Sequence, residues 1–236
     1  MEYAGRHVVV TGGTGALGAA VVDGLLKAGA TCTIPYRHEA EARRFDHRDN
    51  AKVRLIAAGD LSDEAAVAKL YAGIPLWASI HVAGGFAPGK LADTDKTALM
   101  AQLDGNLVSC FLCCRAAVNA MLAAGQETQT AGRIVNVAAR PALEPRSGAG
   151  MTAYTIAKSG VATLTMALAE EVAKDGILVN AVAPSIMDTP ANRKAMPKAD
   201  FDKWPKVEDV AATILFLASP DNRVTRGAIV PVYGKA

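Results

Sequence analysis

Short runs rich in β-branched residues alternate with longer alanine-rich runs along almost the whole chain. Seven strands are predicted, at residues 7–11, 30–35, 52–58, 77–82, 132–138, 176–182 and 227–232. The longer runs have the periodicity of helices, as in residues 16–28, where apolar side chains recur on one face. Strands joined through helices run parallel, and a parallel sheet is covered by helices on both faces. We therefore predict an α/β fold with a doubly wound parallel sheet of about seven strands.

The composition favours one domain over residues 1–236. Half of the residues are hydrophobic (51%), which is enough for a substantial core, and no change in composition marks a second domain. The net charge is only +2, so binding to the phosphates of nucleic acids is not expected. No secretory segment opens the sequence, and the longest apolar stretch, residues 107–118, is interrupted and too short to span a membrane. We expect a cytoplasmic, soluble protein without a membrane partner.

The cysteines and histidines show no spacing typical of a metal site, so no metal is expected. Cys110 and Cys113 form a C-x-x-C pair, but a redox role needs a helix N-terminus, and this pair lies within an apolar helical run. Together with Cys32 and Cys114 they are predicted to be small buried hydrophobic residues.

A glycine-rich turn, residues 11–18, lies between the first predicted strand and the first predicted helix. A turn without side chains lets backbone N–H groups approach a pyrophosphate at the positive end of a helix. We interpret it as a dinucleotide site in a Rossmann-type fold, rather than as a plain tight turn. The residues expected to contact the cofactor here are Gly12, Thr14, Gly15, Leu17 and Gly18.

The end of the second predicted strand carries the residues that would meet the adenosine ribose. Arg37 stands there, with no carboxylate before Glu39. A carboxylate would favour NAD, whereas an arginine pairs with the 2′-phosphate of NADP. We therefore expect NADP(H) to be preferred. The alternative is that Arg37 belongs to a solvated arginine-rich helix face, which leaves NAD(H) open. Asp60 and Leu61, after the third strand, are expected to flank the adenine.

Tyr154 and Lys158 begin a long alanine-rich helical run. Residues four apart share one helix face. A nearby ammonium group favours the phenolate, so we expect Lys158 to lower the pKa of Tyr154 towards the range of a useful proton donor and acceptor.

With these motifs in place, the chain resembles the short-chain dehydrogenase/reductase family over essentially its whole length. The resemblance rests on the turn at 11–18 and on Asp60, Ala83, Gly84, Asn106, Tyr154, Lys158, Asn180, Pro184 and Thr189. It implies that Tyr154 is the catalytic acid/base, that Lys158 binds the nicotinamide ribose and tunes the tyrosine, and that Asn106 supports a proton-relay water. It also places Ala83, Gly84, Pro184, Ile186 and Thr189 at the cofactor, and implies a homodimer or homotetramer that associates through residues 99–123 and 154–173.

One departure from the family pattern concerns the substrate. Ala139 stands where the family usually has a serine, so the hydroxyl that orients the substrate is missing. Ser147 and Thr152 could supply a hydroxyl, although neither has the right spacing. The dihydropteridine reductase branch also lacks the serine, and residues 187–204 are similar to that branch. Residues 185–205 are too long for an ordinary connection and are expected to form a substrate lid.

These features together predict an NADP(H)-dependent oxidoreductase that reduces a carbonyl or quinonoid small molecule by hydride transfer, with Tyr154 as the acid. One alternative is a pterin or imine reductase similar to dihydropteridine reductase. Another, from a different class, is a catalytically silent nucleotide-binding sensor or scaffold. The sequence does not identify the physiological substrate or the direction of the reaction.

Overall fold

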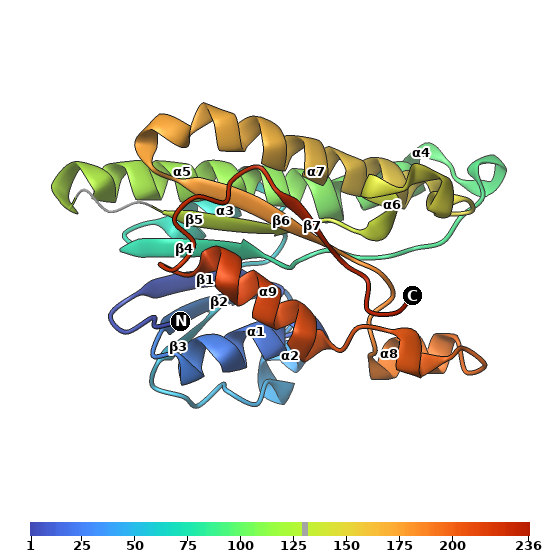
Figure 1. Ribbon diagram of the computed structural model, residues 1–236, viewed down its shortest axis with the longest axis horizontal. Helices are drawn as coiled ribbons and strands as arrows, with labels where there is room; N and C mark the ends of the chain where they lie inside the picture. Colours follow the sequence, from blue (N-terminus) through green and yellow to red (C-terminus); the bar gives the residue numbers. More distant parts are fainter. Residues whose placement is uncertain (129–131) are drawn as a thin grey trace.

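One parallel sheet forms the centre of the computed structural model, which describes residues 1–128 and 132–236. Its seven strands lie in the order β3-β2-β1-β4-β5-β6-β7 (Figure 1). They are β1 (His7–Thr11), β2 (Thr31–Tyr36), β3 (Val53–Ala57), β4 (Leu76–His81), β5 (Arg133–Val137), β6 (Leu178–Pro184) and β7 (Ile229–Val232). The predicted strands are confirmed, with ends that differ by no more than two residues. The chain order reverses between β1 and β4, which is where ligands bind in folds of this kind.

Helices cover both faces of the sheet (Figure 1). One face carries α1 (Ala16–Lys27) and α9 (Val207–Ala218), which pack on each other, and the other carries α3 (Glu64–Tyr71), α5 (Ser109–Thr128) and α7 (Thr152–Glu171). Two hydrophobic clusters fill the space between the layers. Along β1, Val8 and Val10 belong to the cluster under α1 and α9, whereas Val9 belongs to the cluster under α5 and α7. This alternation is the period of a strand buried on both faces.

The apolar stretch around residues 107–118 belongs to a longer helical run than the sequence suggests. Residues Lys96–Ala124 run continuously through α4 (Lys96–Gln102), a π-helical turn (Leu103–Val108) and α5. By length and composition this run could cross a membrane, so the expectation that it is too short is wrong. In the fold, its Cys113, Ala117 and Met121 are buried in the core on the α5 side of the sheet.

The remaining elements are short. They are α2 (Glu39–Arg44), α6 (Arg140–Leu143), α8 (Pro190–Ala195) and the 3₁₀ turns Leu91–Asp93, Pro145–Gly148, Ala173–Asp175 and Phe201–Lys203. Two segments that the sequence leaves irregular, residues 140–150 and 184–205, thus contain single turns of helix. Both lie at the carboxyl ends of the strands, beside the sites described next.

Candidate active site

A cavity of about 640 Å³ opens at the point where the strand order reverses. Most of the residues predicted to bind the cofactor line it: Gly12, Thr14, Gly15, Leu17, Gly18, Arg37, Asp60, Leu61, Ala83, Gly84 and Thr189. Segments from both ends of the chain therefore meet in one place, which is long enough to hold an extended ligand.

The glycine-rich turn brings backbone close to backbone at the floor of this cavity. A Cβ atom on Gly12 would lie 2.6 Å from the amide nitrogen of Ala83, and Gly12 has a φ of +67°, so only glycine is tolerated there. A Cβ on Gly18 would overlap the carbonyl oxygen of Gly12. Gly15, which precedes α1, supplies no side-chain cap, so the first N–H groups of the helix remain available. These features fit the pyrophosphate of a dinucleotide.

Arg37 is the predicted contact for the adenosine ribose, and its side chain is 62% exposed. Its Nη2 lies 3.3 Å from Oδ2 of Asp60, which also lines the cavity. Two hydrogen bonds from Ser62 and, more weakly, the charge of Arg37 lower the pKa of Asp60. An exposed ion pair of this kind contributes little free energy, so a phosphate could displace Asp60 from Arg37. Arg43, Arg44 and Arg48 do not line the cavity and fit the alternative of a solvated helix face.

A second cavity, of about 200 Å³, adjoins the first and shares Leu17, Gly84 and Met187 with it. It is lined by the three predicted catalytic residues, Tyr154, Lys158 and Asn106, and also by Pro184 and Ala139. Ile186 lines neither cavity and is largely exposed. Sequence reasoning missed Phe86, Ser185 and Met187, which line the second cavity from loops that have no pattern of their own.

Lys158 is buried, and its Nζ donates a hydrogen bond of 2.8 Å to the carbonyl oxygen of Val137 at the end of β5. This bond leaves two of the three ammonium donors for other partners. Burial lowers the pKa of the Lys158 ammonium to about 8. The group thus remains charged at neutral pH, but only narrowly.

The ring of Tyr154 lies beside Lys158, with Nζ 5.9 Å from the ring centroid. Burial raises the pKa of Tyr154 to about 12. The predicted lowering is therefore wrong for this structure, because the loss of hydration outweighs an ammonium group at this separation. The phenol is consequently protonated at neutral pH. Phe86 packs edge-on against the Tyr154 ring, with centroids 5.1 Å apart.

Asn106 lies in the π-helical turn and holds the loop that follows β4. Its Nδ2 donates to the carbonyl oxygens of Gly85 and Gln102, each at 3.0 Å, and its Oδ1 accepts from the Gly85 amide at 3.2 Å. A Cβ on Gly84 would lie 2.6 Å from Asn106 Oδ1 and 3.3 Å from Lys158 Nζ. Glycine at position 84 thus allows these polar groups to converge.

Residues near Ala139 do not replace the missing serine. Ala139 is buried and lines the second cavity, whereas Ser147 and Thr152 do not line it. The Ser147 hydroxyl donates to the carbonyl oxygen of Glu144. Ser185 does line the cavity, but its hydroxyl donates to the carbonyl oxygen of Tyr233 at 2.9 Å. Among the described residues that line this cavity, Tyr154 alone offers a hydroxyl that makes no hydrogen bond within the chain.

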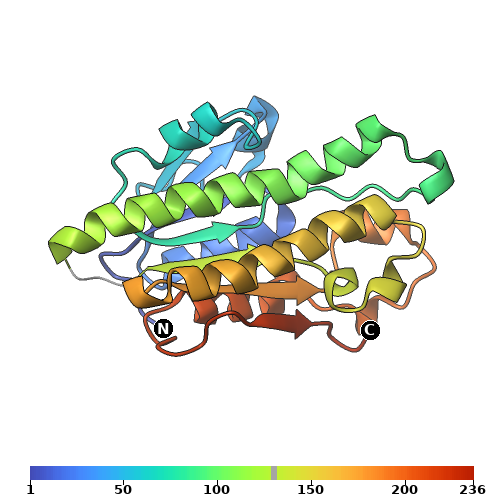
Figure 2. The same ribbon diagram turned by 90° about the horizontal axis from the view of Figure 1, so that it is seen from above.

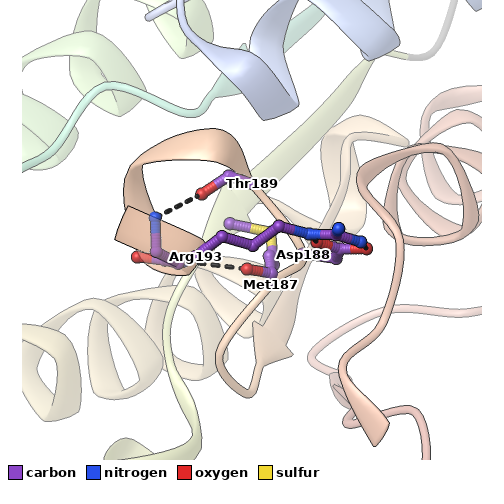
Figure 3. A network of polar contacts seen from close by, with 5 residues as sticks. Met187, Asp188, Thr189 and Arg193 are labelled. Carbon is purple, nitrogen blue, oxygen red and sulfur yellow. Dashed lines mark hydrogen bonds and ion pairs between the residues drawn. The ribbon is translucent and has the colours of Figure 1, made fainter. Parts of the chain in front are cut away.

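The predicted lid begins with a compact polar network (Figure 3). Arg193 donates to both carboxylate oxygens of Asp188, at 2.6 and 2.7 Å, and its guanidinium lies 4.8 Å from the ring centroid of Phe201. The Thr189 hydroxyl caps α8 by accepting from the backbone of Asn192. The Asp188 amide donates to the carbonyl oxygen of Pro205, which brings the two ends of the segment together. The segment is thus an ordered flap beside both cavities.

A family comparison agrees with this geometry. The model of the short chain dehydrogenases matches residues 6–200. The chain belongs to this family. A galactitol 2-dehydrogenase from Rhizobium johnstonii is 34% identical, over 97% of this chain and 93% of its own. A cis-4-hydroxycyclohexanecarboxylate dehydrogenase from Sinomonas cyclohexanicum is also 34% identical, over 98% and 96%.

Solved structures of the family have the same fold. A short-chain type dehydrogenase/reductase from Mycobacterium ulcerans superposes with a TM-score of 0.88 over all of this chain and 90% of its own, at 23% identity. ElxO with NADP bound gives a TM-score of 0.84 over 97% of each chain, at 26% identity. The protein is therefore an NAD(P)-dependent oxidoreductase with a Rossmann-type fold. The similarity to the dihydropteridine reductase branch has no counterpart among these relatives, which are named as dehydrogenases.

Proposed function

We propose that the protein is an NADP(H)-dependent reductase of carbonyl or quinonoid small molecules, with Tyr154 as the proton donor. The observation that carries this proposal is the meeting of Tyr154, Lys158 and Asn106 around a small cavity that opens into the dinucleotide cavity. A catalytically silent sensor would not need a protonated phenol and a buried ammonium group beside the cofactor site.

When bound, NADP(H) supplies a hydride from its nicotinamide ring. The Tyr154 hydroxyl, protonated because of its raised pKa, donates a proton to the heteroatom that gains charge. Lys158, anchored on Val137, directs its remaining N–H groups to the ribose and to the phenol. Asn106 holds the loop at Gly85 and would support a water that returns the proton to Tyr154. Pro184, Ile186 and Thr189 would flank the carboxamide.

The cofactor preference rests on Arg37. It is the arginine that reaches the cavity, and the exposed pair with Asp60 can give way to a 2′-phosphate. The bound NADP and NADPH in two structures of ElxO agree with this preference.

The substrate class follows from Ala139. A side-chain donor at this position would stabilise the oxygen of a simple ketone as it gains charge, and the loss of such a donor typically costs about 10²–10³ in rate. A quinone, dicarbonyl or quinonoid heterocycle delocalises that charge, and its ring could stack on the half-exposed Phe86. We therefore assign substrates of this kind to the second cavity.

A second candidate is a pterin or imine reductase. It is favoured by the lid, because residues 187–204 are similar to the dihydropteridine reductase branch and close beside the second cavity. This candidate uses the same proton donor and differs only in the acceptor.

The test is an acceptor panel that follows the absorbance of NADPH with a small aliphatic ketone, an α-dicarbonyl, a quinone and a quinonoid dihydropterin. We expect the conjugated acceptors to exceed the ketone in kcat/KM by at least about tenfold. The dihydropterin arm decides between the two candidates. In Ala139→Ser the ketone should gain at least about tenfold while the quinone changes little. No NADPH oxidation with any acceptor would favour the silent sensor, and a wild-type preference for the ketone would show that another hydroxyl replaces the serine.

A further inference from the structure

Three side chains that could bind a metal ion lie together in the core beneath α5. One nitrogen of His81 and the Sγ atoms of Cys110 and Cys114 all lie within 4.8 Å of one another, and all three residues are buried. This corrects the sequence expectation that no histidine lies near other metal ligands. We propose that His81, Cys110 and Cys114 form a site for a soft, thiophilic cation, with Cu(I) as its probe.

The local structure explains how these residues meet. Cys110 and Cys114 are four residues apart in α5, so both thiols point to one face of the helix. That face packs on β4, which ends at His81. Nδ1 of His81 is 3.5 Å from Sγ of Cys114. The ligand set thus comes from two rigid elements, and its geometry depends on no loop.

The chemistry of the three donors favours a soft cation. Thiolates select Cu(I) and other thiophilic ions, and imidazole is compatible with them. With metal–ligand bonds of about 2.3 Å or less, three donors around one ion lie about 4 Å apart or closer, so the observed spacing needs only a small contraction. Each thiol would lose its proton on binding, so two protons are released and the complex carries one negative charge.

The neighbours of His81 support a ligand role. The Asn136 amide donates to Thr165, which turns its oxygen towards Nδ1 of His81 at 2.8 Å. Nε2 of His81 lies 2.7 Å from the Ser79 hydroxyl. When Nδ1 binds the ion, the ring proton moves to Nε2 and is donated to Ser79. An oriented partner on the second ring nitrogen is usual for histidine ligands of metals.

The cofactor cavity offers a route to this buried site. Cys110 follows the π-helical turn Leu103–Val108 by two residues, and Gly105 and Ser109 line that cavity. π-Helical turns often mark functional positions in helices. We expect bound NADP(H) to slow the loading of the ion without changing the ligand set.

The test is a titration of the purified, reduced protein with Cu(I) against a chromophoric chelator, with X-ray absorption on the loaded protein. The expected result is one equivalent of tightly bound copper with two sulfur ligands and one nitrogen ligand. Cys110→Ala and Cys114→Ala should each weaken binding at least about tenfold. Cys32→Ala removes a buried thiol from the opposite core cluster and should leave binding unchanged.

Two results would overturn the proposal. One is wild-type protein that binds no copper in competition with the chelator. The other is copper that persists in both Cys110→Ala and Cys114→Ala or that shows no nitrogen ligand in the wild type. If a variant fails to fold, as judged by thermal unfolding, the wild-type absorption spectrum still decides, because it reports the ligand set directly.

Discussion

At the scale of single residues, the two groups of the proposed proton donor have pKa values shifted by burial in opposite directions. Tyr154 has a pKa of about 12 and stays protonated below that value, whereas Lys158, with a pKa of about 8, keeps its charge only below pH 8. Reduction needs both the phenol and the ammonium group. The upper limit of activity is therefore expected to come from Lys158.

We predict that kcat/KM for NADPH is level at neutral pH and falls about tenfold per pH unit above about pH 8. This parameter reports the free enzyme, to which these pKa values belong. Lys158→Arg keeps its charge at higher pH, so whatever activity it retains should not fall there. A wild-type profile that stays level far into the alkaline range would show that the ammonium group is dispensable.

The second residue-scale prediction concerns the cofactor. Arg37→Ala should lower the ratio of kcat/KM for NADPH to that for NADH by about tenfold or more, because a charge-assisted pair with the 2′-phosphate is lost. Arg44→Ala is the matched control, since its side chain bonds to the Ala40 carbonyl and does not line the cavity. A ratio that is unchanged in Arg37→Ala would remove this residue from cofactor selection.

At the scale of elements, the lid is held by the pair of Asp188 and Arg193 (Figure 3). Arg193→Ala should raise KM for the substrate about two- to fivefold, the range of a partly exposed ion pair, because the flap loses a clamp and its contact with Phe201. Thermal unfolding should change little. Lys203→Ala breaks a more exposed pair with Asp200 in the same segment and serves as the control. Equal KM values in wild type and Arg193→Ala would show that this network does not order the substrate site.

The sequence reveals some elements of the site better than others, for physical reasons. The glycine turn and the Tyr154/Lys158 spacing are local features, so their placement could be predicted. The direction of the Tyr154 pKa could not, because it depends on burial by loops distant in sequence. The cluster of His81 with Cys110 and Cys114 was also missed, since only the packing of α5 on β4 joins these residues.

At the scale of the whole molecule, α5 and α7 lie side by side on one side of the sheet (Figure 2). Phe111 on α5 and Ile156 and Met166 on α7 are about half exposed, which is unusual for large apolar side chains on an unpartnered surface. We propose that this face joins subunits. The expected assembly is a homodimer or homotetramer.

Light scattering should therefore give a mass two or four times the 24.4 kDa of the chain. Phe111→Asp combined with Met166→Asp should reduce it to one chain, because buried charges at an apolar contact are strongly unfavourable. Val224→Asp, at an apolar residue exposed elsewhere, is the control. A wild-type monomer at micromolar concentration would contradict the proposal.

The account as a whole depends on Tyr154 as the proton donor, and Tyr154→Phe tests this most directly. The variant keeps the ring that packs against Phe86 and loses only the hydroxyl. With the best acceptor of the panel, turnover should fall by about 10²-fold or more, the usual contribution of a positioned acid, while the Kd for NADPH stays within about twofold of wild type. Turnover close to that of wild type, with NADPH bound as tightly, would show that the proton comes from another group.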